Sequence, residues 1–519
     1  MSATQFGPWR RSLFVGLIAI FAVSSTSQWV CAQGAKPKYF VVPIAADLQE
    51  GTPKYKDLVQ TKSRTVAGSA SFSDPTVRAK MDLWYQKYFF RSFTHPDQLE
   101  KLPLKRRELL ADLARTGSRQ STQDVYAYLR QQAEFWGKGF VNSKQPFHPA
   151  VRFNAMLLLG DLNALEKSVA QKRRLPEPYA PMLGELVNAL NQPKQIDAVK
   201  VAALIGLLRH AKLQWAGQNP HVSIKKRNFI AKMMLAIVNT QQPPAGRSDS
   251  GHIWMQRRAV EILAALRMIG EADVYNNAIA SIVSNPESDL SLRCTAARSL
   301  ALLNAKGRNP IDPEDTSLKL GALAVNCVQA DLAWIDDFKL RKEIKKIADE
   351  AAAGGGGGGG GGMGGGMGGM GGMDGEMGAP EDEGGDDGAS AMMGSMGGGG
   401  SKRAPLDPEV NLARRRLKYK LVCVRRGLSA VVEAAQGNAQ VENVSDMVDA
   451  IMLATDPPED DPTLDGLAKG LRVQIRALER LTRSAVPEAQ EEAPVSAAPS
   501  AAPVSGIPAP SRTTATRGG

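Results

Sequence analysis

The feature that most constrains the fold of this chain is an apolar stripe with helical spacing that recurs through its middle. One copy runs from Val151 to Leu162, with apolar side chains at i, i+4, i+7, i+8 and i+11. Residues with this spacing lie along one side of an α-helix, and the stripe must be buried against other helices. Aromatic residues, which favour strands, make up only 6% of the chain. The chain is therefore predicted to be all-α.

The stripe recurs with a basic residue near its start. The pairs Val151-Arg152, Val199-Lys200 and Leu292-Arg293 open three copies, and Arg257-Arg258 opens a looser one. Further amphipathic stretches alternate with these copies, at about 178–190, 224–240, 272–285 and 316–330. The helices are therefore expected to come in pairs.

This alternation, with the phrase V-R/K-x-x-A-x-x-x-L in the second helix, resembles HEAT repeats of the armadillo type. The resemblance implies a solenoid in which stacked helix pairs form one continuous core. It also implies that the basic and acidic residues of the phrase bond between adjacent repeats. Because the basic residues stand at 152, 200, 258 and 293, the solenoid is expected to be irregular compared with repeats of about 40–47 residues.

The rest of the chain is divided around this region. The expected segments are a signal peptide at 1–32, an extended lead-in at 33–74, an N-terminal helical cap at 75–144, HEAT-like repeats at 145–353, an insertion at 354–405, a C-terminal helical segment completing the array at 406–483, and a tail at 484–519. An aromatic cluster from Trp84 to Phe93 is interpreted as the packed interior of the cap.

Two segments have a composition that cannot form a core. Residues 354–405 are mostly Gly and Met with acidic side chains, and residues 484–519 are rich in Pro, Ala and Ser. Such segments bury too little apolar surface to offset the entropy of ordering. They are predicted to be a long disordered insertion within a helical region and a disordered tail.

The N-terminus has the three parts of a secretory signal peptide. Arg10 and Arg11 are followed by an apolar run, Leu13 to Val23, and by the small-residue site that ends at Ala32. The apolar run is too short to span a bilayer, which takes roughly 20 residues. The chain is predicted to be exported, whether periplasmic, envelope-associated or secreted, with no transmembrane segment in the mature protein. Retention of the signal as an anchor remains an alternative.

Three cysteines lie beyond the signal, and each falls in an apolar helical run: Cys294, Cys327 and Cys423. In such runs cysteine behaves as a small apolar side chain. An oxidising compartment would also permit one disulfide, and a bond between Cys327 and Cys423 would clamp the two ends of the insertion.

The net charge of +11 favours anionic partners. Three clusters of basic residues are the candidate partner-binding residues: Lys172, Arg173 and Arg174; Lys225, Lys226 and Arg227; and Arg414, Arg415 and Arg416. A protein partner is the leading expectation, with an anionic glycan as an alternative. Export argues against nucleic acid. Runs of this kind are also common on solvated helix faces.

The methionines of the insertion suggest a second function. Five of them are spaced three or four residues apart: Met363, Met367, Met370, Met373 and Met377. Thioether ligands select Cu(I), so copper handling is an alternative function. The competing interpretation is a flexible linker in which the methionines bind no metal. No other cofactor is predicted.

Motifs for catalysis are missing from the sequence. It contains no G-x-S-x-G, H-E-x-x-H, C-x-x-C or P-loop pattern, and its five histidines are scattered. The chain is therefore predicted to be a non-enzymatic exported scaffold or adaptor that binds its partner through a basic helical surface. An enzyme accessory subunit is the further alternative. The oligomeric state is left open.

Overall fold

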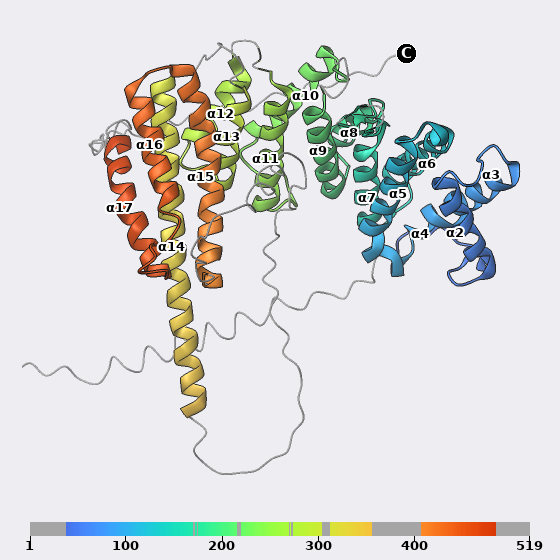
Figure 1. Cartoon of the computed structure of the whole chain (residues 1–519), viewed down its shortest axis with the longest axis horizontal. Coiled ribbons are helices and arrows are strands. Elements are labelled where there is room, and N and C mark those ends of the chain that lie inside the picture. Colours follow the sequence, from blue (N-terminus) through green and yellow to red (C-terminus); the bar gives the residue numbers. More distant parts are fainter. Residues whose placement is uncertain are drawn as a thin grey trace, which may run out of the picture. The chain divides into compact units, whose positions relative to one another are not determined.

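The computed structural model describes residues 38–169, 172–173, 175–214, 220–268, 270, 273–303, 312–354 and 406–483. The regular secondary structure of these residues is almost entirely helical, which confirms the all-α prediction (Figure 1). The chain divides into two compact units, Met1–Arg308 and Asn309–Gly519. The expectations for the signal peptide, for residues 355–405 of the insertion and for the tail fall outside the described residues.

The described part of unit 1 begins at residue 38, and the prediction of an extended lead-in at 33–74 is wrong for part of it. Residues 38–44 are extended, but η2 (Ala46–Leu48) and the 14-residue helix α2 (Pro53–Val66) follow. The side chain of Thr52 accepts a hydrogen bond from the backbone N–H of Tyr55, and Pro53 occupies the first helical turn. Both features favour a helix start. The sequence does not predict this helix, because few of its side chains are apolar and no apolar stripe marks it.

The helical cap follows. Its elements are α3 (Pro75–Asp82), η3 (Leu83–Phe89), α4 (Phe90–Ser92), η4 (Pro96–Lys101), α5 (Leu102–Gly117) and η5 (Gln120–Thr122). The aromatic cluster predicted from Trp84 to Phe93 is buried, and Phe90 has no exposed surface. The rings of Phe89 and Phe90 meet edge to face, with centroids 5.2 Å apart. Segment η3 is π-helical, a rare backbone form that is common near functional sites.

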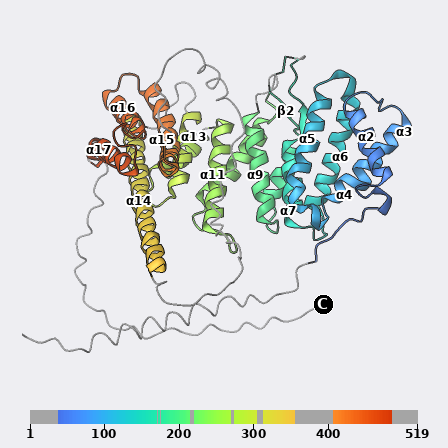
Figure 2. The same ribbon diagram turned by 60° about the horizontal axis from the view of Figure 1, so that its bottom comes forward.

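The remainder of unit 1 consists of helix pairs. The helices are α6 (Gln123–Asn142), α7 (Pro149–Asp161), α8 (Met182–Asn191), α9 (Asp197–Lys212), α10 (Ile224–Asn239), α11 (Asp249–Leu266), α12 (Val274–Ser284) and α13 (Leu290–Leu303). Each even-numbered helix packs on the odd-numbered helix that follows it. Helices α7, α9, α11 and α13 also pack in a row, so the pairs are stacked side by side (Figures 1 and 2).

Polar side chains join neighbouring pairs. Nη2 of Arg152 on α7 donates to Oε1 of Gln195, which precedes α9, over 2.7 Å. Arg247, ahead of α11, donates from Nε and Nη2 to the carboxylate of Asp197 on α9, both over 2.8 Å. The bonds expected between adjacent pairs are thus present at Arg152 and Asp197. Arg293 differs, because its Nε donates to the carbonyl of Val283 within its own pair.

A short antiparallel pair of strands interrupts the helices. Strands β1 (Asn163–Leu165) and β2 (Glu177–Pro178) flank the turn between α7 and α8. Buried Tyr126 donates from its hydroxyl to the carbonyl of Asn163 over 2.6 Å, which fixes the strand pair to α6.

Unit 2 contains α14 (Pro313–Gly354), α15 (Pro408–Ala435), α16 (Ala439–Leu453) and α17 (Leu464–Arg483). The expected division, with 145–353 as one block and 406–483 completing its array, is wrong at α14. This helix groups with α15–α17 and not with α6–α13. Its first half buries Leu320, Leu323, Val328 and Ile335 in the core of unit 2. An amphipathic pattern shows that a helix has a buried face, but not which helices cover it.

Helix α14 also meets the length and composition of a membrane span. Over Pro313–Ala351 its most apolar window has a mean hydropathy of 1.2, and 56% of that window is buried inside the structure. No segment of this kind was expected after the signal peptide. Among the described residues, α14 is the one segment that contradicts this expectation. A core helix has the same composition, and packing against α15–α17 accounts for the buried part of the window.

The three cysteines lie in the two cores, as predicted for small apolar side chains. Cys294 belongs to α13, Cys327 to α14 and Cys423 to α15, and all three are buried. The bond between Cys327 and Cys423 stays a prediction.

Candidate functional site

The predicted basic clusters differ in how much of their charge is left for a partner. Lys172 and Arg173 lie in the turn between β1 and β2, and Nη1 of Arg173 donates to the carbonyl of Glu166 over 2.6 Å. Arg174 lies outside the described residues. Arg173 of this cluster therefore helps to stabilise its own turn.

Two of the three arginines in the cluster on α15 interact with side chains of unit 2. Arg414 forms an ion pair with Asp456. The guanidinium of Arg416 lies 4.5 Å from the ring centroid of Trp334, and its Nε lies 3.7 Å from the carboxylate of buried Asp331. Arg415 is left on the exposed side of the helix.

At the start of α10, Lys225 and Lys226 of the predicted cluster face solvent, whereas Arg227 is half-buried. Ser223 caps the helix by accepting from the backbone N–H of Lys226. Lys225, Lys226 and Lys232 are exposed, and 52% of the surface of Phe229 is exposed among them. Positions 225, 229 and 232 share one helix face, and 226 stands one turn before 229. Together Lys225, Lys226, Phe229 and Lys232 form the α10 patch.

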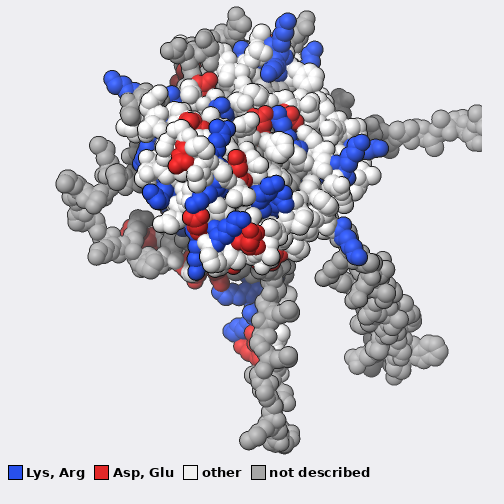
Figure 3. All heavy atoms as spheres, turned by 90° about the vertical axis from the view of Figure 1, so that its right-hand side faces the viewer, with Lys and Arg blue, Asp and Glu red and all other residues white. Residues whose placement is uncertain are grey.

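None of the ion pairs found within the described ranges involves a lysine of the α10 patch. Its charge is therefore not neutralised within the described structure. Elsewhere the surface is mixed, and on the face shown in Figure 3 Lys and Arg are interspersed with Asp and Glu. Sequence reasoning found Lys225 and Lys226 but missed Phe229 and Lys232. The pattern of lysines at i, i+1 and i+7 with an aromatic residue at i+4 would have indicated them.

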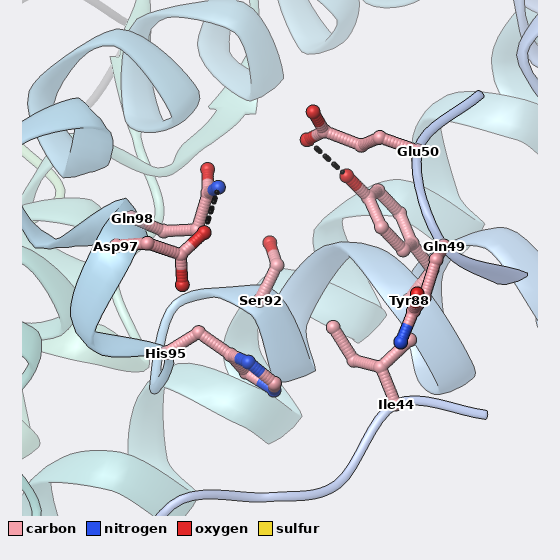
Figure 4. A pocket seen from close by; sticks show the side chains of 8 residues that line it. All are labelled: Ile44, Gln49, Glu50, Tyr88, Ser92, His95, Asp97 and Gln98. Atoms are coloured by element: carbon pink, nitrogen blue, oxygen red, sulfur yellow. Dashed lines mark hydrogen bonds between the residues drawn. The ribbon is translucent and has the colours of Figure 1, made fainter. Parts of the chain in front are cut away.

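A small polar pocket lies beside the π-helical segment η3. Its volume is about 300 Å³, and its lining comes from the turn before α2, from η3, from α4 and from η4: Ile44, Gln49, Glu50, Tyr88, Ser92, His95, Asp97 and Gln98. In Figure 4 the carboxylates of Glu50 and Asp97 stand on opposite sides of this space. The lead-in closes one side, because Nε2 of His95 is 3.0 Å from the carbonyl oxygen of Val42.

Burial and hydrogen bonds shift the pKa values of groups around the pocket. The hydroxyl of Tyr88 donates to Oε1 of Glu50 over 2.7 Å, and burial together with this bond raises the pKa of Tyr88. A hydrogen bond from the side chain of Gln98 lowers the pKa of Asp97. Burial lowers the pKa of Lys105, whose Nζ lies 2.9 Å from Oγ of Ser92.

This geometry suits binding more than nucleophilic attack. A serine activated by lysine must direct its hydroxyl hydrogen to the amine. Here Ser92 donates to the carbonyl of Phe89 over 2.6 Å and accepts from Lys105, and only 2% of its surface is exposed. The carboxylates of Glu50 and Asp97 would instead receive hydrogen bonds from a small polar molecule.

Two of the histidines that are scattered in the sequence meet in space. Nδ1 of His210, at the end of α9, lies 3.3 Å from Nε2 of His221. His210 is fully buried, and burial lowers its pKa to about 3. Burial also lowers the pKa of His221.

Metal ligation has no support among the described residues, where three or more His, Cys, Asp or Glu side chains do not gather in a group suited to a metal. The predicted Cu(I) ligands Met363, Met367, Met370, Met373 and Met377 lie outside the described residues. Copper handling therefore stays a prediction.

Comparison with known proteins adds no assignment. No family model, curated protein or solved structure matches the chain.

Proposed function

We propose that this chain is a non-enzymatic, exported scaffold that binds an acidic partner protein at the α10 patch. One observation carries the proposal. Three lysines without an ion-pair partner in the described structure surround a half-exposed phenylalanine on one helix of the stacked array. Aromatic anchors ringed by charge are typical of protein interfaces, and complementary charge speeds and orients association.

The stacked helix pairs of unit 1 support this function. Stacked pairs present an extended surface on a stiff frame, and the bonds from Arg152 to Gln195 and from Arg247 to Asp197 hold successive pairs in register. The likeness to HEAT repeats remains part of the proposal, as does export. A stable array lets α10 keep its orientation, so little entropy is lost when a partner binds.

Site-specific photo-crosslinking in cells tests the proposal. A photoreactive amino acid replaces Phe229 in one chain and Phe135, another exposed phenylalanine, in a matched control. We expect one acidic protein to be crosslinked from position 229 and not from position 135. The triple variant K225E/K226E/K232E should lose that adduct while its helix content and thermal midpoint stay unchanged, because all three side chains are exposed.

A second triple variant, K56E/K87E/K144E, reverses three exposed lysines outside α10 and should keep the adduct. Identical adducts from positions 229 and 135, or an adduct at 229 that survives reversal of the α10 lysines, would show that the patch is not the partner surface.

A further inference from the structure

The second half of α14 extends beyond the helices that cover the first half. Nζ of Lys342 lies 2.9 Å from the carboxylate of Glu409 at the start of α15, and Lys339 pairs with Asp465 at the start of α17. Residues 341–351 are all exposed. In Figures 1 and 2 this part of α14 projects past the ends of α15 and α17.

The projecting half has its own apolar stripe. Leu340, Ile344 and Ile347 are 55%, 58% and 58% exposed. Their spacing of four and then three residues is the heptad spacing of a coiled coil, with Ile344 at an a position and Leu340 and Ile347 at d positions. Ala351 occupies the next a position.

This stripe faces away from the core of unit 2. The first half of α14 buries Val328, Leu332 and Ile335, which share one face. An α-helix turns about 100° per residue, so Ile344, nine residues after Ile335, lies about 180° around the helix. The helices that cover Ile335 therefore cannot cover Ile344.

The charges beside the stripe select its partner. The g positions that flank it are all acidic: Asp336, Glu343 and Glu350. The e positions on the other flank are Arg341 and Ala348. Between parallel helices g residues meet e residues of the partner, so Asp336 would meet Arg341 of the partner subunit and Glu343 would meet Ala348 of the partner subunit. Antiparallel pairing would bring acidic flank to acidic flank.

We propose that the projecting half of α14 docks on the same segment of a second copy of this chain, forming a parallel two-stranded coiled coil. Of the stripe residues, Ile344 at a with Leu340 at d is the combination that favours two strands. Asp336 lies five residues before Arg341, the offset at which it meets Arg341 of the partner subunit. Asp336 now pairs with Arg472 on α17 over 3.0 Å, in an exposed ion pair. Arg341 is 78% exposed at its side chain and now pairs with Asp337 on its own helix, an exposed pair that exchanges readily. The proposal is independent of the α10 patch.

Sedimentation equilibrium of the mature chain tests the proposal, over concentrations from about 1 to about 200 µM because the stripe is short. We expect a monomer–dimer equilibrium. The variant I344E/I347E should weaken the dimer at least about tenfold and leave the helix content unchanged. The matched control V473E changes a side chain that is equally exposed at 58%, on α17, and should dimerise like the wild type.

A cysteine in place of Ala351 tests the register. In the parallel coiled coil the two introduced cysteines face each other and form a disulfide between copies under mild oxidation. In an antiparallel pair they stand at opposite ends, so a dimer that A351C does not crosslink overturns the proposal. So does a chain that stays monomeric throughout the concentration range, or a dimer that I344E/I347E leaves intact. Binding of monomers to vesicles of anionic lipid, lost in I344E/I347E, would assign the stripe to lipid instead.

Discussion

His210 and His221 show how burial sets the chemistry of single residues. Each imidazole contacts the other at one nitrogen, over 3.3 Å. Burial is the main reason that the pKa of His210 falls to about 3, and the neighbouring charges of His221 and Arg209 lower it further. A proton on this pair would be a buried charge, and the charged neighbours that act on His210 in the described structure are His221 and Arg209, neither of them a carboxylate.

Acid should therefore destabilise unit 1 through His210. The folded pKa lies below the unfolded value of about 6.5, so between these values the unfolded chain binds a proton that the folded chain does not. Stability falls as the pH drops through 6.5 toward 3, by up to about 1.4 kcal/mol per pH unit for this group. Urea unfolding at pH 7.5 and pH 4.5 measures the loss, which should be about 2 kcal/mol smaller in His210→Gln. Equal losses in the two proteins would contradict the buried neutral state of His210.

At the scale of elements, α7 and α9 approach each other through glycine. A Cβ atom built on Gly160 would lie 2.8 Å from Cα of Gly206. A Cβ atom on Gly206 would lie 2.8 Å from Cδ2 of Leu186 and 3.0 Å from Cα of Gly160. The two helices pack this closely because neither glycine has a side chain, and this contact joins one helix pair to the next.

Alanine at Gly160 should separate the helices. Alanine is favoured over glycine within a helix by about 1 kcal/mol, but the clash with the backbone of α9 forces the pairs apart. We expect Gly160→Ala to lower the free energy of unfolding by about 2 kcal/mol, measured by urea denaturation. Gly184→Ala on α8 is the matched control, because nothing lies within 4 Å of its added Cβ, and it should stabilise the chain slightly. A stabilised Gly160→Ala variant would show that the helices are not this close.

At the scale of the molecule, the described helices form two units with separate cores. Unit 2 buries apolar side chains from all four of its helices, and buried Asp331 on α14 pairs with Lys420 on α15 over 2.8 Å. Helices α14 and α15 are far apart in the sequence, so the core of unit 2 forms only when both are present.

Unit 2 should fold without unit 1. We expect a chain of residues 309–483 to be helical and to unfold in one cooperative transition, because its core is made of its own four helices. Circular dichroism during urea denaturation measures this. Leu421→Ala removes a fully buried side chain and should lower the midpoint, whereas Leu453→Ala changes a leucine that is 76% exposed and should not. A helical fragment that lacks a cooperative transition would place part of its core in unit 1.

The sequence by itself determined the helical class and most of the helices, because an apolar stripe at helical spacing is a local property. It also predicted that α8 to α13 come in pairs, the bond made by Arg152 and two lysines of the α10 patch. It missed α2 because few of the side chains of this helix are apolar.

Only the tertiary structure decided which helix covers which stripe, since packing partners are set by shape across long distances in the sequence. It moved α14 into unit 2 and brought His210 to His221. It paired Arg414 and Arg416 with side chains of their own unit. It left Phe229 and Ile344 facing solvent. Local spacing shows that a side chain is on a face, whereas the neighbouring helices decide whether that face is covered.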